Sequence, residues 1–320
     1  MKKRGRKPID YKTTWGETVE GLHRKPDGRF RCRKTGREWS VTSYRTERDI
    51  VNEFLGRPPE EPPVLEAHDP EPTLRTPLRW FEGKAMFARR IANLLPVHDR
   101  YFEPFAGSAA VLFAKPPANL EKINDLDRDV VNFFTVLRNP ANGLELQRRL
   151  QLTPYAREEY ENCKTPDAGL NAVERARRFF VVCRQSFGDH WATSQQKPLA
   201  KYTRNIVDDL DAIVDRLREV QVDNLDFRKF LKGIPDEPDV LVYADPPYLI
   251  EKQIDRAQHS GRWFTTKDHN DLLDVFSGYK AAKVALSGYD TELYRQRLAH
   301  WKRHEFVERE IGAECLWLNW

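Results

Sequence analysis

The chain has 320 residues, of which 40% are hydrophobic and 32% are charged, so it is long enough for one large or two modest domains, and its net charge is +4. A run of about 18 apolar residues is absent, which excludes a membrane span, and the basic N-terminus lacks the apolar stretch of a secretory signal. The four cysteines have no metal-ligand spacing and are too few for a disulfide scaffold, so we expect reduced thiols in a cytoplasmic protein without a metal site.

The positive charge is concentrated at the N-terminal end of the chain. Residues 1–56 contain 15 Lys or Arg and 8 Asp or Glu, a net charge of +7, whereas the two signs balance at 36 each beyond residue 76. This is typical of an appendage that binds a polyanion, although a solvated basic face has the same composition. The run KKRGRKP resembles an AT-hook arm, with Arg4, Arg6 and Lys7 as candidate DNA contacts. Lys7 interrupts that motif, and a generic basic tail would look alike.

A small folded module is expected after this arm. Two glycine turns divide residues 22–44 into three short strands, and the segment TERDIVNEFL has the apolar spacing of a helix. Arg29, Arg31 and Arg33 alternate, so all three would point to one face of the sheet and could contact phosphates. We therefore predict a DNA-binding α+β module at 1–56, similar to the small arm-type DNA-binding domains of phage integrases.

A proline-rich segment separates this module from the body of the chain. Residues 57–76 hold six prolines and five acidic residues, which cannot bury a core, and we expect a stiff linker at 57–73. Within the body, at 74–320, strands are expected at 101–105, 121–125, 239–245, 281–288, 305–310 and 314–320, and helices at 127–138, 171–187, 205–220 and 266–279. The alternation predicts an α/β fold with a mainly parallel, doubly wound sheet, and ligands at the carboxyl ends of its strands.

Small and acidic residues follow the expected strands of the body. Gly107 opens a run of small residues after the first strand, which lets a ligand approach the backbone, although a plain strand-to-helix turn looks the same. Asp125 follows the second strand at a spacing that suits a ribose diol, although it could equally cap the next helix. Asp226 and Phe227 follow a third short strand.

The segment VLVYADPPYL, residues 240–249, ends an apolar strand with an acid and two prolines. A plain turn would explain this, since Pro cannot extend a central strand. A second interpretation is chemical. The carboxylate of Asp245 and the carbonyl of Pro246, held rigid by Pro247, could both accept hydrogen bonds from one exocyclic amine, while Tyr248 stacks on the base. Pulling on those N–H groups strengthens a lone pair that is otherwise conjugated into the ring, so the segment suits catalysis by orientation and electrostatics.

Taken in order, these motifs resemble the D12-class, Dam-like N6-adenine DNA methyltransferases of the type often carried by bacterial viruses, across about residues 74–320. The segment PLRWFEGKAMFARRI is similar to the family's cofactor segment, YFEPFAGSAAV to its methionine-binding loop, and INDLDRDVVNFF to its ribose-binding acid. The pair DF looks like its adenine-edge pair, and DPPY like its catalytic tetrapeptide. The resemblance implies a Rossmann-like methyltransferase sheet, S-adenosylmethionine as cofactor and double-stranded DNA as partner.

The resemblance also assigns expected roles to individual residues. The cofactor would be bound by Trp80, Lys84, Phe105, Gly107, Asp125, Asp226, Phe227 and Asp245, and the catalytic residues would be Asp245, Pro246, Pro247 and Tyr248. Two positions depart from the family pattern, because Glu82 replaces a glycine before Gly83, and Ala109 replaces the second glycine of the loop. We expect the first to shift the backbone near the cofactor carboxylate and the second to weaken cofactor binding, without loss of activity.

The region at about 138–220 corresponds to the insertion that this family uses to recognise its target sequence. There the segment RQSFGDHWATSQQ offers Arg184 and Trp191 as candidate DNA contacts, although aromatic residues more often pack in a core. The target adenine is stacked in the duplex and would have to be extruded.

The sequence favours a sequence-specific adenine-N6 methyltransferase, which we expect to be a monomer, over two rival functions. Cytosine-N4 methyltransferases more often carry Ser in place of Asp245. A catalytically inactive DNA-binding protein could retain the fold, but the presence of Asp245, Tyr248, Asp125 and Lys84 together argues for activity.

Overall fold

The structure is a computed structural model that describes residues 11–12, 18–19, 22–24, 30–32, 38–39, 51, 54–55, 74–79, 84–165, 167–187, 190–191, 199–249, 264–309 and 312–320. Its contacts divide the chain into two units, Met1–Glu71 and Pro72–Trp320, which are described separately below. The expected linker at 57–73 lies outside the described residues.

The N-terminal unit contains the three-stranded antiparallel sheet that the turn pattern predicts. Its strands are β3 (Leu22–Arg24), β4 (Phe30–Cys32) and β5 (Glu38–Trp39). A further pair that the sequence did not indicate is formed by β1 (Tyr11–Lys12) and β2 (Thr18–Val19). Val19, Leu22, Phe30 and Val51 make a small core, with the half-buried Phe54 packed against it. Arg31 lies in β4, whereas Arg29, Arg33 and the basic arm lie outside the described residues.

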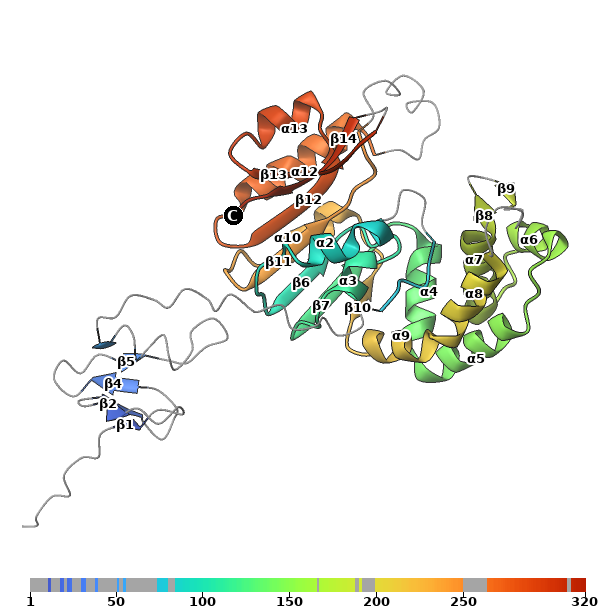
Figure 1. Cartoon of the computed structure of the whole chain (residues 1–320), viewed down its shortest axis with the longest axis horizontal. Coiled ribbons are helices and arrows are strands. Elements are labelled where there is room, and N and C mark those ends of the chain that lie inside the picture. The colour runs from blue at the N-terminus through green and yellow to red at the C-terminus, as the bar shows by residue number, and fades with distance from the viewer. Residues whose placement is uncertain are drawn as a thin grey trace, which may run out of the picture. The chain divides into compact units, whose positions relative to one another are not determined.

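The second unit is built on one seven-stranded sheet (Figure 1). Its strands are β6 (Arg100–Glu103), β7 (Leu120–Asn124), β10 (Gln221–Asp223), β11 (Val240–Ala244), β12 (Lys283–Tyr289), β13 (Lys302–Arg309) and β14 (Gly312–Leu318). They lie in the order β10-β7-β6-β11-β12-β14-β13. The first five are parallel, and β14 runs antiparallel to both of its neighbours. The predicted α/β fold with a mainly parallel sheet is therefore confirmed.

Helices cover both faces of this sheet. They are η1 (Lys84–Met86), α2 (Ala88–Ala92), α3 (Ala110–Ala114), α4 (Arg128–Arg138), α10 (Phe227–Lys232), α12 (Thr266–Gly278) and α13 (Glu292–Arg297). Strand β11 shows why two faces are needed, since every one of its residues is buried. Leu241 and Tyr243 join a core with α2, α3 and α4, while Val240, Val242 and Ala244 join a second core with α10 and α12.

Between α4 and β10 the chain forms a helical insertion, which lies to the right of the sheet in Figure 1. It consists of α5 (Pro140–Gln151), α6 (Arg157–Lys164), α7 (Ala172–Gln185), β8 (Ser186–Phe187), β9 (His190–Trp191), α8 (Leu199–Asp208) and α9 (Leu210–Leu217). The prediction of a single helix at 205–220 is wrong, because the structure has two helices, α8 and α9, which are separated by Asp209. No helix in the described part of the chain is long and apolar enough to cross a membrane.

Candidate active site

The order of the strands reverses between β6 and β11, because the chain turns to one side of the sheet after β6 and to the other side after β11. In open parallel sheets, ligands bind outside the carboxyl ends of the strands at such a switch point. The loop that contains Gly107 follows β6, and the segment Asp245–Tyr248 follows β11. The structure therefore brings the two most distinctive sequence motifs to one place.

Asp245 lies in a compact cluster of charged and aromatic side chains. Lys84 Nζ is 3.0 Å from Asp245 Oδ1 and 3.0 Å from Glu314 Oε1. The Tyr248 hydroxyl donates to the same Asp245 oxygen at 3.1 Å and approaches Glu314 Oε1 at 3.4 Å. The ammonium of Lys84 also stands 4.4 Å from the centre of the Tyr248 ring. Lys84 and Tyr248 thus both contact Asp245, and Glu314 contacts the two of them, so that four side chains from three distant segments form one cluster.

In the described part of the chain, the two hydrogen-bond acceptors expected for the substrate amine have no hydrogen-bond donor. Both contacts to the Asp245 carboxylate go to Oδ1, and no described residue donates to its Oδ2 or to the carbonyl of Pro246. The Asp245 side chain is 21% exposed, whereas Lys84 and Glu314 are buried. Asp245 is therefore the carboxylate of the cluster that a ligand can reach.

Burial and charge set the protonation of this cluster. Burial alone would lower the pKa of Lys84, but Asp245 and Glu314 outweigh it and raise that pKa. Burial raises the pKa of Asp245, and the Lys84 ammonium opposes the shift. Burial also holds the pKa of Tyr248 well above its usual range, so its hydroxyl stays a hydrogen-bond donor. Within the cluster Lys84 is therefore a cation and Tyr248 a neutral phenol.

The loop after β6 has an unusual backbone. Gly107 has φ 46° and Ala109 has φ 51°, and Ala109 is the one residue other than glycine with positive φ in the described chain. The left-handed region suits glycine because a Cβ crowds the next carbonyl. The hydroxyl of the buried Thr76 fixes the loop by donating a hydrogen bond to the Ser108 carbonyl at 2.5 Å. Ala109 therefore stands at a position where its Cβ introduces strain.

Asp125 is tied to this loop through the backbone. Its Oδ2 accepts the Gly107 N–H at 2.8 Å, and its Oδ1 accepts the Asp127 N–H at 2.9 Å. The residue that caps α4 is Asp127, so Asp125 is not needed as a cap. Burial raises the pKa of Asp125 to about 6. A backbone hydrogen bond from Leu126 also lowers the pKa of this carboxyl group. A carboxylate accepts hydrogen bonds through both of its oxygens, and the hydroxyls of a ribose are donors of the matching kind.

Aromatic rings lie beside this carboxylate loop. The centre of the Phe105 ring is 5.5 Å from that of Phe227 and 5.4 Å from that of Phe264, and the latter two are 5.2 Å apart. Asp226 caps α10 by accepting the Arg228 N–H at 2.9 Å, and it also pairs with the Arg228 guanidinium. Aromatic rings next to a carboxylate are an arrangement that can hold the base and the ribose of a nucleoside.

Two contributors to the site were not expected from the sequence. Phe264 precedes α12 and completes the aromatic group, and Glu314 lies in β14. Glu314 shares a face of that strand with Leu316 and Leu318, which are both buried. A carboxylate at an inward position of an otherwise apolar strand is the signal that could have identified Glu314.

Several predicted site residues cannot be placed relative to this cluster. Trp80 lies outside the described residues, and the Trp191 side chain is likewise undescribed. Arg184 lies in the last turn of α7 and is half-buried. Burial and the neighbouring Arg79 lower the pKa of Arg184 to about 10. Among the described residues there is no cluster of His, Cys, Asp and Glu that could hold a metal ion.

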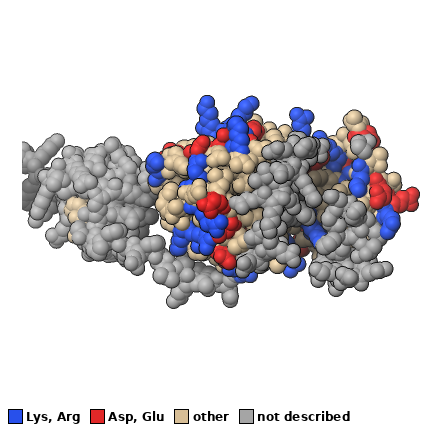
Figure 2. Space-filling model, turned by 90° about the horizontal axis from the view of Figure 1, so that it is seen from above, with Lys and Arg blue, Asp and Glu red and all other residues tan. Residues whose placement is uncertain are grey.

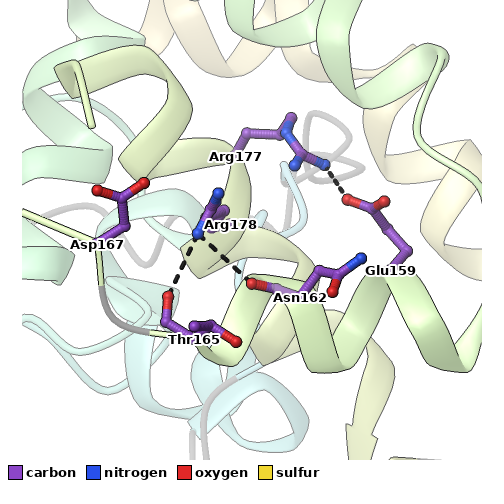
Figure 3. Close-up of a pocket in the computed structure, with 6 residues that line it drawn as sticks. All are labelled: Glu159, Asn162, Thr165, Asp167, Arg177 and Arg178. Atoms are coloured by element: carbon purple, nitrogen blue, oxygen red, sulfur yellow. Dashed lines mark hydrogen bonds and ion pairs between the residues drawn. The ribbon is translucent and has the colours of Figure 1, made fainter. Parts of the chain in front are cut away.

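A polar pocket occurs in the helical insertion, between α6 and α7 (Figure 3). It is lined by Glu159, Asn162, Thr165, Asp167, Arg177 and Arg178. The guanidinium of Arg178 donates to the Asn162 and Thr165 carbonyls at the end of α6, at 3.4 and 3.3 Å. Arg177 pairs with Glu159 at 2.6 Å. Both arginines therefore serve to join the two helices.

Comparisons with known proteins agree with the family resemblance. The model of the D12 class N6 adenine-specific DNA methyltransferase family matches residues 80–310. Among solved structures, SMU.472 in complex with SAH is 11% identical, with 73% of this chain and 52% of that chain covered and a TM-score of 0.32. This chain thus spans about half the length of SMU.472. A SAM-dependent methyltransferase from Agrobacterium tumefaciens is 12% identical, with 94% and 74% covered and a TM-score of 0.30. TM-scores this low support no conclusion about shared structure, so the assignment of this chain to a family rests on the family model alone.

Proposed function

Because the chain belongs to the D12 class N6 adenine-specific DNA methyltransferase family, we propose that it transfers a methyl group from S-adenosylmethionine to N6 of an adenine in a specific DNA sequence. The observation that carries this proposal is the Asp245 cluster at the sheet's switch point. Its Oδ2, to which no described residue donates, and the Pro246 carbonyl form a pair of acceptors suited to one NH2 group.

In the proposed reaction the protein orients the groups and stabilises charge. When bound, S-adenosylmethionine supplies a methyl carbon on a positively charged sulfur: the N6 lone pair forms the new C–N bond, the C–S electron pair stays on sulfur, and the positive charge passes to N6. Asp245 faces that charge and takes the proton that N6 then releases. Tyr248 stacks on the extruded adenine, whose extrusion costs a few kcal/mol. Asp125 and the aromatic group of Phe105 and Phe227 hold the nucleoside of the cofactor.

DNA contacts of the body are assigned to the helical insertion. Arg79 is close enough to Arg184 for its positive charge to lower the pKa of the Arg184 guanidinium. A DNA phosphate bound between the two guanidinium groups would offset their repulsion. Figure 2 shows Lys and Arg on the described part of one face in separate groups with Asp and Glu among them, and not as one continuous basic surface. We therefore assign most of the nonspecific DNA affinity to residues 1–56, whose net charge is +7.

The test of the activity is transfer of labelled methyl from S-adenosylmethionine to mixed-sequence DNA, followed by analysis of the modified base. N6-methyladenine is the expected product. N4-methylcytosine would replace the adenine assignment, and cofactor binding without transfer to any DNA would establish an inactive binding protein.

The test of the N-terminal unit is deletion of residues 1–72. Because log K falls with log salt by about 0.9 for each phosphate neutralised, the deletion should weaken DNA binding and flatten its salt dependence by a few phosphate equivalents. The methylated sequence should stay the same. A changed recognition sequence would reassign base reading to the N-terminal unit, and an unchanged salt slope would show that this unit does not contact DNA.

A further inference from the structure

Lys84 connects two carboxylates of the reaction centre. It stands 3.0 Å from both Asp245 Oδ1 and Glu314 Oε1, and its side chain is only 5% exposed. Glu314 is equally buried, and its Oε1 is 3.4 Å from the Tyr248 hydroxyl. Glu314 therefore contacts the two side chains that also contact Asp245, although it comes from a strand at the far end of the chain.

The charge of the cluster bears directly on methyl transfer. Lys84 and Asp245 alone would sum to zero, so the positive charge that passes to N6 would meet a carboxylate already neutralised by an ammonium. At the separations in this cluster, a second buried carboxylate interacts strongly with both charges. With Glu314 included, the sum is −1, which attracts a developing positive charge on N6.

The fold itself gives no reason for an acid at this position. Glu314 points to the same side of β14 as Leu316 and Leu318, into a core where an ionised carboxylate is costly to bury. Because β14 runs antiparallel to β12, Glu314 pairs with Tyr289 at the carboxyl end of that strand. The first part of β14 thus lies at the edge of the sheet where the reaction takes place.

We propose that Glu314 is a positioning residue that holds Lys84 and keeps the reaction centre anionic, so that Asp245 can act on the adenine amine. This inference rests on the proposed function. It assigns Glu314 no contact with the substrate, and its action passes through Lys84 and Tyr248.

The test is Glu314→Gln, which keeps the shape and removes the charge. The single-turnover rate of methyl transfer should fall about 100-fold, while cofactor affinity and DNA affinity change little. Glu305→Gln is the matched control, because Glu305 is an exposed acid on the neighbouring β13, and it should keep the wild-type rate. A Glu314→Gln enzyme with the wild-type rate would overturn the inference and leave the proposed function standing. Absence of transfer by the wild-type enzyme would overturn the proposed function instead.

A double-mutant cycle separates this role from a merely structural one. In a Lys84→Met background there is no ammonium to compensate, so adding Glu314→Gln should change the single-turnover rate by less than about threefold. An equal loss in both backgrounds would show that Glu314 acts without Lys84 and would overturn the inference. Circular dichroism melting curves check that the variants are folded, and the double variant, which carries neither charge, keeps the test valid if the single variant unfolds.

The pH profile gives a second readout. Burial raises the pKa of Asp245, Lys84 lowers it, and Glu314 raises it. The other titratable groups that face Asp245 are Glu103 in β6, Tyr243 in β11, Tyr248 and Tyr294 in α13. Loss of the Glu314 charge should therefore move the acid limb of the rate profile to lower pH while the plateau falls. A lower plateau with an unmoved or raised acid limb would contradict charge compensation.

Discussion

Two carboxylates follow strands of the same sheet, and they are held in opposite ways. Asp245 is fixed by the side chains of Lys84 and Tyr248, whereas Asp125 is fixed by the backbone N–H groups of Gly107 and Asp127. A backbone N–H is lost only on substitution by proline, and it carries no net charge. A side-chain network can be dismantled one residue at a time, and each residue changes the charge of the others. The two sites should therefore respond differently to mutation and to pH.

The largest effect is expected at the side-chain-held carboxylate. Asp245→Ala should reduce methyl transfer by more than about 1,000-fold, because the amine loses the acceptor that strengthens its lone pair. Cofactor affinity should largely survive, since Asp245 acts mainly on the base. Single-turnover rates and equilibrium binding measure the two quantities. A variant that keeps a tenth of the activity would refute the role of Asp245.

At the backbone-held carboxylate, the effect should appear in binding. Asp125→Asn should weaken S-adenosylmethionine binding by about 10- to 100-fold, because hydrogen bonds from the ribose hydroxyls to a charged acceptor are lost. At saturating cofactor, the transfer rate should recover. Isothermal titration and saturation kinetics check both points. A rate loss that saturating cofactor cannot restore would mean that Asp125 takes part in the reaction itself.

A smaller effect concerns the pH dependence of cofactor binding. The pKa of Asp125 is raised to about 6, mainly by burial, and the ionised form is the better acceptor for hydroxyls. Affinity should therefore be constant above pH 6 and fall as the pH drops below it, by at most about tenfold per unit. Asp125→Asn, which has no carboxyl group to titrate, should bind equally at pH 5 and pH 8. A wild-type affinity that stays constant down to pH 5 would argue against a ribose contact.

The smallest effect concerns the loop that supplies the backbone amide. In Ala109→Gly, relief of about 1–2 kcal/mol of left-handed strain is partly offset by loss of a buried methyl group worth about 0.8 kcal/mol. The net gain in the free energy of unfolding should be about 0.5 kcal/mol. Ala110→Gly, one residue later in α3, loses a methyl group and helix propensity together, so it should destabilise by about 1–2 kcal/mol. Urea denaturation measures the difference, and equal stabilities would contradict a strained Ala109.

The contrast also explains what the sequence could and could not predict. Asp125 and Gly107 follow adjacent strands, and periodicity alone places them at one edge of the sheet. The alternation of β14 marks Glu314 as facing inward, but it does not say which strand lies beside β14. The contact of Glu314 with Lys84 depends on β14 pairing antiparallel with β12, which is a long-range choice. Local patterns therefore identified Asp125 and Gly107, and in the side-chain cluster they identified Lys84, Asp245 and Tyr248 but not Glu314.

The position of β14 has a consequence for the order in which the protein becomes competent. This strand is synthesised after every other strand of the sheet, yet it lies between β12 and β13. The five parallel strands can pair while the chain is still being made. Strand β14 can be inserted only after all of the other strands have left the ribosome. Its pairing with β13 is local, because the two strands are adjacent in sequence, whereas its pairing with β12 is of longer range and forms more slowly. Because β14 carries Glu314, the step that completes the sheet also completes the reaction centre. In a chain that lacks β14, the Lys84–Asp245 pair would have no second carboxylate beside it, and its net charge would be zero.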